Sequence, residues 1–401
     1  MIRLPQHKDG APFFAWSTTL VVLLGVLSAW ADPISGCLIN ASGLLLVSFW
    51  LLRFGFTGGV HWLIIPLLML SAYGLVQIAL HWTVSPFETW NAIYIWLSRA
   101  AFLYLAFATL KSAKLRTSVL SLALGFGTLF AIIGMIQWST SNGKVLWLIP
   151  TAYNDEVFGT FPNRDHYAVF AELILPIALT RALMSDIRWP YSLAAGVIYA
   201  SVVESGSRGG TAIVSLEALI IMAIALYRRA NEYRWVLSAA ALMTICSLAS
   251  GWQYVWFRFH STNLFAFRRE MALASIQMIQ TRPFRGFGLG TWPMVYPAFA
   301  LFDPPGFYMN HAHNDWLELI AEGGLLVAMT ILTISCGSVL LSRSSLWAIG
   351  IPAALLHALV DFPLQKPAIA TLIFFLLGAA AAAAQTGNRN NVGHTIREEG
   401  N

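Results

Sequence analysis

Long apolar runs recur along the whole chain, and they constrain its fold more than any other feature. A helix needs about 20 consecutive apolar residues to cross roughly 30 Å of bilayer hydrocarbon. Hydrophobic residues make up 57% of the chain and charged residues only 11%, against about 25% charged residues in soluble domains. The sequence therefore predicts an all-α, polytopic membrane helical bundle. We expect about twelve transmembrane helices, at 14–31, 37–52, 60–80, 91–110, 118–138, 167–184, 190–203, 211–227, 235–251, 317–341, 345–360 and 367–384.

Basic residues in the short loops predict how the bundle is oriented. Cytoplasmic loops are enriched in Lys and Arg. If the N-terminus is cytoplasmic, the inner loops hold Lys111, Lys114, Arg116, Arg228, Arg229 and Arg234, among others. The short outer loops hold only Lys144, Arg164, Arg208 and Lys366. Both termini of this multi-pass protein are therefore expected on the cytoplasmic side of the membrane.

One outer segment, 252–316, is much longer than the other loops, and we call it the lid. Apolar residues at helical spacing predict an amphipathic helix over 268–280, which Pro283 ends. Gly286-Phe287-Gly288-Leu289-Gly290 permits a tight turn and a close backbone approach to a ligand. Prolines 293, 297, 304 and 305 predict an extended return path. The lid is expected to belong to a single transmembrane domain, 1–384, followed by a disordered cytoplasmic tail, 385–401.

A dense polar cluster, His311-Ala-His313-Asn314-Asp315, runs directly into a predicted span. Titratable groups at such a position are costly to desolvate, which makes them functional-site candidates. The ordinary pKa of histidine, about 6.5, suits His313 as a general base. Two other interpretations stay open. In the first, His311 and His313 cap the helix at headgroup level, and Asn314 or Asp315 is an ordinary N-cap. In the second, His311, His313, Asp315 and Glu318 bind a metal ion.

Two further polar clusters enter predicted spans from the same side. Ser207-Arg208-Gly209-Gly210 places a guanidinium at a helix start, where an anion such as a diphosphate binds well. Arg268 and Arg269 could supply a second clamp, although interfacial arginines also bind lipid headgroups. Asn163-Arg164-Asp165-His166 is the other cluster. Arg99 lies inside a predicted span, so it must face a cavity or a partner, or snorkel outward.

Four separate motifs together resemble the O-antigen ligase and polymerase superfamily of bacterial membrane glycosyltransferases. They are Asn163-Arg-Asp-His166-Tyr-Ala; Ser207-Arg208-Gly-Gly; Arg268, fifteen residues before Pro283, with the glycine run 286–290; and His313-Asn314, separated by nine residues from Gly324. The ligase form often has Gly, Thr or Tyr three places after that last glycine, where this chain has Val327. Ligase and polymerase therefore both stay open.

The resemblance implies a GT-C-like fold and an inverting, metal-independent transfer that needs no cofactor. Its donor would be a glycan on undecaprenyl diphosphate, and its acceptor lipid A-core or another glycan, on the periplasmic face of the membrane. His313 would activate the acceptor hydroxyl, and Arg208 and Arg268 would bind the diphosphate. The other candidate substrate-binding residues are Arg269, His311, Asn314, Asn163, His166 and Arg164.

Other classes of protein fit parts of this sequence. An O-antigen or exopolysaccharide polymerase would use the same chemistry with a lipid-linked repeat unit as acceptor. A transporter of lipid-linked sugars would also have many spans, but the long loop here is external and no repeated halves are visible. A structural protein would not need the histidines and arginines on the outer side. The net charge of +5 is ordinary for basic cytoplasmic loops and indicates no nucleic-acid partner.

Overall fold

The computed structural model describes residues 7–56, 59–151, 156–228, 233–260, 268–300 and 308–398. These residues form helices joined by loops, with two isolated β-bridges and no strand among them. The all-α membrane class is therefore confirmed. Nine of the described helices are long and apolar enough to cross a membrane. They are α1 (His7–Leu27), α2 (Ile34–Phe54), α4 (Pro86–Thr109), α5 (Ala113–Thr140), α6 (Arg164–Met184), α8 (Arg208–Arg228), α9 (Tyr233–Ser250), α13 (Asp315–Ser344) and α15 (Pro367–Glu398).

Nine candidate spans lie among the described residues, where the sequence predicted about twelve, because three predicted spans form shorter helices. The first two are α3 (Ile64–Ala79, 16 residues) and α7 (Trp189–Ser205, 17 residues). The third, 345–360, forms the 3-10 helix η4 (Leu346–Ile349) and the eight-residue α14 (Gly350–His357). A helix of eight residues is about 12 Å long, far less than the roughly 30 Å of hydrocarbon. Gly350 packs directly on the backbone of Glu172 in α6, so this apolar run covers α6 inside the protein.

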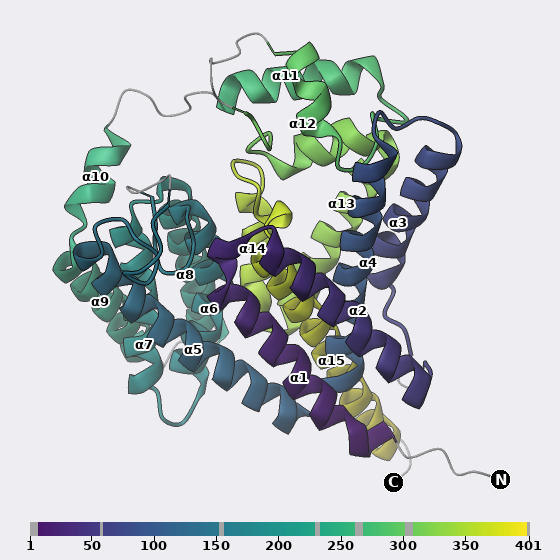
Figure 1. Ribbon diagram of the computed structural model, residues 1–401. Helices are drawn as coiled ribbons and strands as arrows, with labels where there is room; N and C mark the ends of the chain where they lie inside the picture. Colours follow the sequence, from purple (N-terminus) through teal and green to yellow (C-terminus); the bar gives the residue numbers. More distant parts are fainter. Residues whose placement is uncertain are drawn as a thin grey trace.

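The most buried spans are α4, α6 and α15, at the centre of the bundle (Figure 1). Helices α4 and α15 approach closely because Gly378 lies against the backbone carbonyl of Leu103, where a Cβ would not fit. Gly43 of α2 receives the ring of Phe102 in the same way. Small residues permit such close packing in membranes, where van der Waals contact stabilises helix pairs. Helix α15 continues through Glu398, across most of the segment whose composition predicts a disordered tail.

The lid covers one end of the bundle, which we call the lid side (Figure 1, top). It contains α10 (Gln253–Phe259), α11 (Arg268–Thr281), α12 (Trp292–Val295) and the 3-10 helix η3 (Tyr296–Ala298). Helix α11 confirms the predicted amphipathic helix. Its buried face, with Met271 and Met278, packs with Trp292 and Tyr296, whose rings stack at 4.6 Å.

The prolines predicted an extended return path for the lid, but the chain is helical over 292–298. Pro293 lies in the first turn of α12 and Pro297 in the first turn of η3. Proline is well tolerated there, because the first helical N–H groups have no partner inside the helix. Pro304 and Pro305 lie outside the described residues.

The glycine run fastens the lid to α13, whereas the sequence predicted a close approach to a ligand. The N–H groups of Phe287 and Gly288 donate to the carbonyls of Ala321 and Glu322, at 3.1 and 2.9 Å. Gly286 has φ +63°, and a Cβ there would overlap the Glu322 carbonyl. Helix α13 is itself broken at Gly324, also at φ +63°, where Pro283 and Phe284 pack. The lid is therefore held at a fixed position against the helix that follows His313.

Candidate active site on the lid side

His313 stands immediately before α13 in a constrained backbone conformation. Its φ is +49°, in the left-handed region that non-glycine residues rarely adopt. Asn314 is the N-cap of α13, because its side chain accepts from the Leu317 N–H at 3.0 Å. The same side chain donates to the Leu359 carbonyl at 2.7 Å. Asn314 therefore fixes the start of the helix, and the His313 ring is left to make other contacts.

The His313 ring faces the carboxylate of Asp361, which the sequence analysis did not select. Its Nδ1 atom lies 3.5 Å from one Asp361 oxygen, and Nε2 of His166 lies 3.5 Å from the other. The Asp361 side chain is only 1% exposed. Burial acts to raise the pKa of this carboxyl, but the imidazoles of His166, His313 and His357 and the charge of Arg268 outweigh burial and lower the pKa. Asp361 is thus a buried anion that two imidazoles share.

Phe362 organises three histidines around its ring. Its centroid lies 4.6 Å from that of His311 in a stacked arrangement, and 4.7 Å from those of His166 and His313, which both meet it edge-on. Phe362 is itself buried. Aromatic contacts of this kind restrict ring orientation in addition to burying area. Phe362 therefore sets the directions of imidazoles that come from two distant segments.

The loop that carries Asp361 is tied to the start of α13. The N–H of Asp315 donates to the carbonyls of Ala358 and Asp361, at 2.9 and 3.2 Å. The Asp315 carboxylate accepts from the Leu364 N–H at 2.7 Å. On the other side, the guanidinium of Arg99 donates to the Leu364 carbonyl and lies 4.1 Å from the Trp96 ring centroid. The arginine inside a predicted span thus has a partner, the backbone of the loop that carries Asp361.

The residues of a hypothetical metal site point to separate partners. His311 Nδ1 lies 2.9 Å from Glu318, whose other oxygen accepts from the Ala312 N–H at 2.7 Å. His313 contacts Asp361, and Asp315 accepts from Leu364. Within the described ranges, no group of three or more His, Cys, Asp or Glu side chains is placed to hold a metal ion.

An arginine-rich surface, which we call the arginine cluster, lies next to these histidines. It comprises Arg208 at the start of α8, Arg268 at the start of α11, Arg258 in α10 and Arg164 at the start of α6. The four lie close enough for their charges to interact at Arg208. Arg208 also donates to the Arg258 carbonyl at 3.2 Å.

Arg268 connects this cluster to the Asp361 region. It forms an ion pair with Asp165 at 2.9 Å, and Ser207 donates to the same carboxylate at 2.6 Å. Burial acts to lower the pKa of Arg268, but the charges of Asp165 and Asp361 raise it. The motifs that begin α6, α8 and α11 therefore meet at Asp165, although they lie far apart in the sequence.

The remaining predicted residues take distinct places. Arg164 is buried and bonds to Tyr254 and Glu156, at 2.7 and 3.0 Å. Asn163 caps α6 by accepting from the Asp165 N–H. Arg269 has a side chain that is 76% exposed and forms an ion pair with Glu270 at 3.9 Å.

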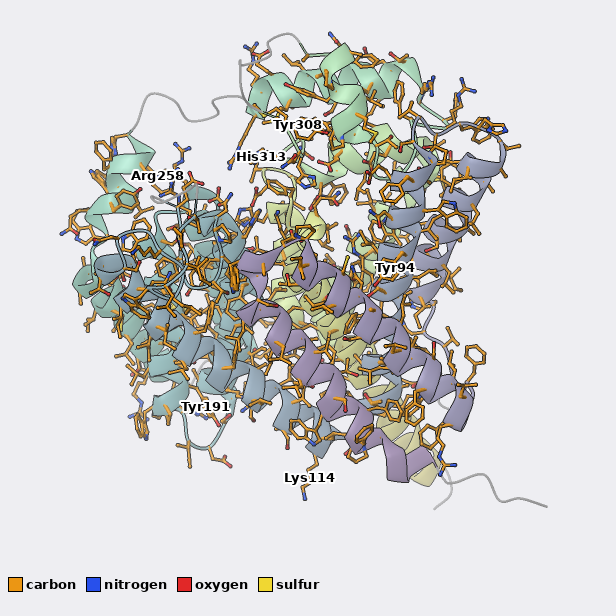
Figure 2. All side chains as sticks on the ribbon, viewed as in Figure 1. Tyr94, Lys114, Tyr191, Arg258, Tyr308 and His313 are labelled. Atoms are coloured by element: carbon orange, nitrogen blue, oxygen red, sulfur yellow. The ribbon has the colours of Figure 1, made fainter. Side chains whose placement is uncertain are left out.

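A cavity of about 610 Å³ opens beside the histidines. Four segments line it, drawn from 29–35, 156–166, 308–313 and 362–368, and they include His166, His311, His313 and Asn163. Figure 2 shows His313 and Tyr308 together under the lid helices, with Arg258 to their left. The site thus has a base candidate, its carboxylate partner, a cationic cluster and a cavity in one region.

Residues 193–332, about a third of the chain, match the family model described as O-antigen ligase. This match supports the resemblance to the O-antigen ligase and polymerase superfamily. The matched segment contains Arg208, Arg268 and His313, three of the residues that carried the resemblance. No curated protein matches the chain. The match supports an O-antigen ligase-like, glycosyltransferase-like function in a membrane protein.

Asp361 and Phe362 lie outside the matched segment, and sequence reasoning missed them. The one available signal was a carboxylate in Val360-Asp361-Phe362-Pro363, directly after an apolar run. Such a carboxylate is also a common loop residue on a protein surface. Its burial against three imidazoles becomes apparent only in the folded chain.

Proposed function

We propose that the chain is an O-antigen ligase-type inverting glycosyltransferase. It moves a glycan from undecaprenyl diphosphate to a sugar acceptor such as lipid A-core, on the periplasmic face of the bacterial inner membrane. The observation that carries the proposal is the His313–Asp361 pair, which faces a cavity and lies beside the arginine cluster. A base and a diphosphate receptor are the two parts that this transfer needs.

The ring nitrogens of His313 have different roles in this scheme. Nδ1 faces Asp361, so the carboxylate favours the tautomer with hydrogen on Nδ1 and leaves Nε2 to accept a proton. The acceptor hydroxyl oxygen attacks the anomeric carbon, and its proton passes to Nε2. Asp361 then stabilises the imidazolium that forms, as carboxylates do in related acid–base pairs. The attack inverts the configuration at the anomeric carbon.

The arginine cluster stabilises the leaving group. When the bond between the anomeric carbon and the diphosphate oxygen breaks, its electron pair stays on that oxygen. Arg208 and Arg268 would accept the added charge, and a fixed guanidinium costs little reorganisation at that moment. The ion pair with Asp165 holds Arg268 in place before the donor binds. A diphosphate is already a good leaving group, so charge stabilisation with one base suffices without a metal ion.

The deciding experiment measures glycan transfer by purified protein in lipid nanodiscs, with lipid-linked donor and lipid A-core acceptor. We expect His313→Ala to abolish transfer and to keep donor affinity. His81→Ala is the matched control, because His81 is exposed, lies far along the chain and has a similar φ of +53°. Each variant loses an imidazole at a left-handed backbone position. Near-normal turnover in His313→Ala would exclude the mechanism.

A second candidate function is polymerisation, favoured by Val327 at a position where the ligase form often has Gly, Thr or Tyr. Val327 is buried and lies against Gly323. The lipopolysaccharide of a deletion strain separates the two functions. Lipid A-core without any polymer indicates a ligase, whereas a band with a single repeat unit indicates a polymerase. Unchanged lipopolysaccharide would point to an exopolysaccharide polymerase.

A further inference from the structure

We propose that the cavity beside His313 is the acceptor glycan subsite, and that the acceptor sugar stacks on Trp30 and Tyr308. This inference rests on the proposed function and adds where the acceptor binds and what chemistry it presents. The cavity is formed largely by segments outside the family match, namely 29–35, 156–166 and 362–368.

The first argument concerns the two sides of His313. Of the arginine cluster, neither Arg208, Arg258 nor Arg268 is among the described residues that line the cavity, whereas His313 is. In an inverting displacement the nucleophile and the leaving group lie on opposite sides of the reacting carbon. With the diphosphate on the arginines, the acceptor must approach from the other side. The cavity is the space available there.

The second argument concerns aromatic surface. Trp30, in the 3-10 helix η1 (Ala29–Ala31), is 40% exposed, and Tyr308 is 69% exposed. Both line the cavity. Flat, rigid aromatic faces with a polar edge bind the C–H faces of sugar rings, and they lose little conformational entropy in doing so. Asp32, Asn163 and Asn310 line the same space and can bond to sugar hydroxyls.

A contrasting groove argues that the cavity binds sugar and not lipid chains. A groove of about 690 Å³ lies between α3 and α13, and its lining is largely apolar, with Ile65, Met69, Leu325 and Met329. The cavity beside His313 mixes aromatic rings with carboxylates and amides. A hydrocarbon chain in that cavity would displace water from these polar groups and offer no hydrogen bond in its place.

The third argument concerns charge. The cavity contains two acidic residues, and each is already paired: Asp32 with Lys366 at 3.5 Å, and Glu156 with Arg164 at 3.0 Å. Among the described lining residues there is no Arg, and the one Lys, Lys366, is paired with Asp32. The occupant is therefore a hydroxyl-rich, largely uncharged sugar, and phosphate groups belong at the arginine cluster.

The Trp30 platform is held in place by contacts to the rest of the site. Lys366, which pairs with Asp32, also lies 5.2 Å from the Phe362 ring centroid. Thr160 donates to the Val26 carbonyl at 2.5 Å, and Gly36 packs on Pro367. These contacts connect the turn between α1 and α2 to Thr160 and to the loop that carries Phe362. A sugar stacked on Trp30 would thus be positioned relative to His313.

The test measures the acceptor KM at saturating donor, the donor Kd, and binding of a soluble, lipid-free acceptor oligosaccharide by calorimetry. We expect Trp30→Ala to raise the acceptor KM about three- to tenfold or more, which is the loss of one aromatic contact. Tyr308→Ala should act in the same direction, and Trp30→Phe should keep most of the affinity. Donor Kd should stay unchanged in all three. Trp147→Ala is the matched control, because Trp147 is also 40% exposed and does not line the cavity.

The outcomes separate this inference from the proposed function. If Trp30→Ala raises the donor Kd and leaves the acceptor KM unchanged, the cavity holds the donor glycan and the inference is wrong, while the transfer function stands. Unchanged values for both substrates in Trp30→Ala and Tyr308→Ala also overturn the inference. If the wild type binds the oligosaccharide through Trp30 and performs no transfer, the proposed function fails and the glycan site stands.

Discussion

Nδ1 of His313 lies 3.5 Å from Oδ1 of Asp361, and the second oxygen of this buried carboxylate lies equally close to His166. A single carboxylate therefore interacts with two imidazoles, one in the first turn of α6 and one directly before α13. It also makes the proposed base dependent on a loop outside the family-matched segment.

We expect Asp361→Asn to reduce turnover about 100-fold or more, because an amide cannot stabilise the imidazolium or fix the Nδ1–H tautomer of His313. Donor Kd should change less than about threefold. Steady-state kinetics with a parallel donor-binding measurement check both values. Asp186→Asn, in the loop before α7, serves as a control for loss of an outlying carboxylate. Wild-type turnover in Asp361→Asn would show that His313 works without its partner.

We expect Arg208→Ala and Arg268→Ala each to weaken donor binding about ten- to a hundredfold, since a charge-assisted hydrogen bond is worth roughly 1.5–3 kcal/mol. Arg208→Lys should keep only part of the donor affinity, because lysine lacks the planar, two-pronged guanidinium. Arg269→Ala is the neighbouring control, since its side chain is 76% exposed and pairs with Glu270. Donor Kd values decide the prediction. Unchanged donor affinity in both variants would show that Arg208 and Arg268 do not bind the donor diphosphate.

We expect Arg99→Met to destabilise the protein and to lower turnover while the Km for both substrates changes little. Arg99 holds the Leu364 carbonyl, and its charge acts on the buried carboxylates Asp315 and Glu322. Removing one member of a buried ionic group costs about 3–5 kcal/mol. Thermal unfolding in detergent and steady-state kinetics are the measurements. A stable variant with full turnover would show that the loop that carries Asp361 does not need the contact with Arg99.

We expect transfer to continue in excess chelator, because the arginine cluster supplies the positive charge that a metal ion would otherwise supply. Activity is measured before and after extensive dialysis against chelator, and again after adding zinc or magnesium. Loss of transfer that a metal ion restores would reassign His311 or His313 as ligands and remove the general-base proposal.

We expect reporter fusions to place residues 111–116 and 228–234 in the cytoplasm and the lid outside. The reason is the enrichment of Lys and Arg in the loops on the first side. Fusions are made after the corresponding helices and compared for periplasmic and cytoplasmic signals. A cytoplasmic signal near residue 295 would place the whole site on the other face of the membrane and contradict the proposed function.

The sequence by itself determined those features that depend on neighbouring residues. Hydropathy identified the membrane-spanning helices, because each run meets lipid or apolar side chains along its own length. Helical periodicity and Pro283 placed the lid helix α11, and Asn314 was foreseen as an N-cap. His313, Arg208 and Arg268 were found from their motifs, since each motif lies within a short stretch of chain.

Only the tertiary structure decided which of these residues meet. Asp361 and Phe362 gain their roles from His166, His311 and His313, and no local pattern reports such contacts. The apolar run 345–360 looked like a span, yet it packs on α6 inside the protein. Of the glycines at 286–290, Gly286 packs on α13, Gly288 on Thr83 and Gly290 on the backbone of Glu88 in α4. Hydropathy and spacing describe what a segment can bury, whereas the cavity depends on how segments distant in sequence are brought together by packing.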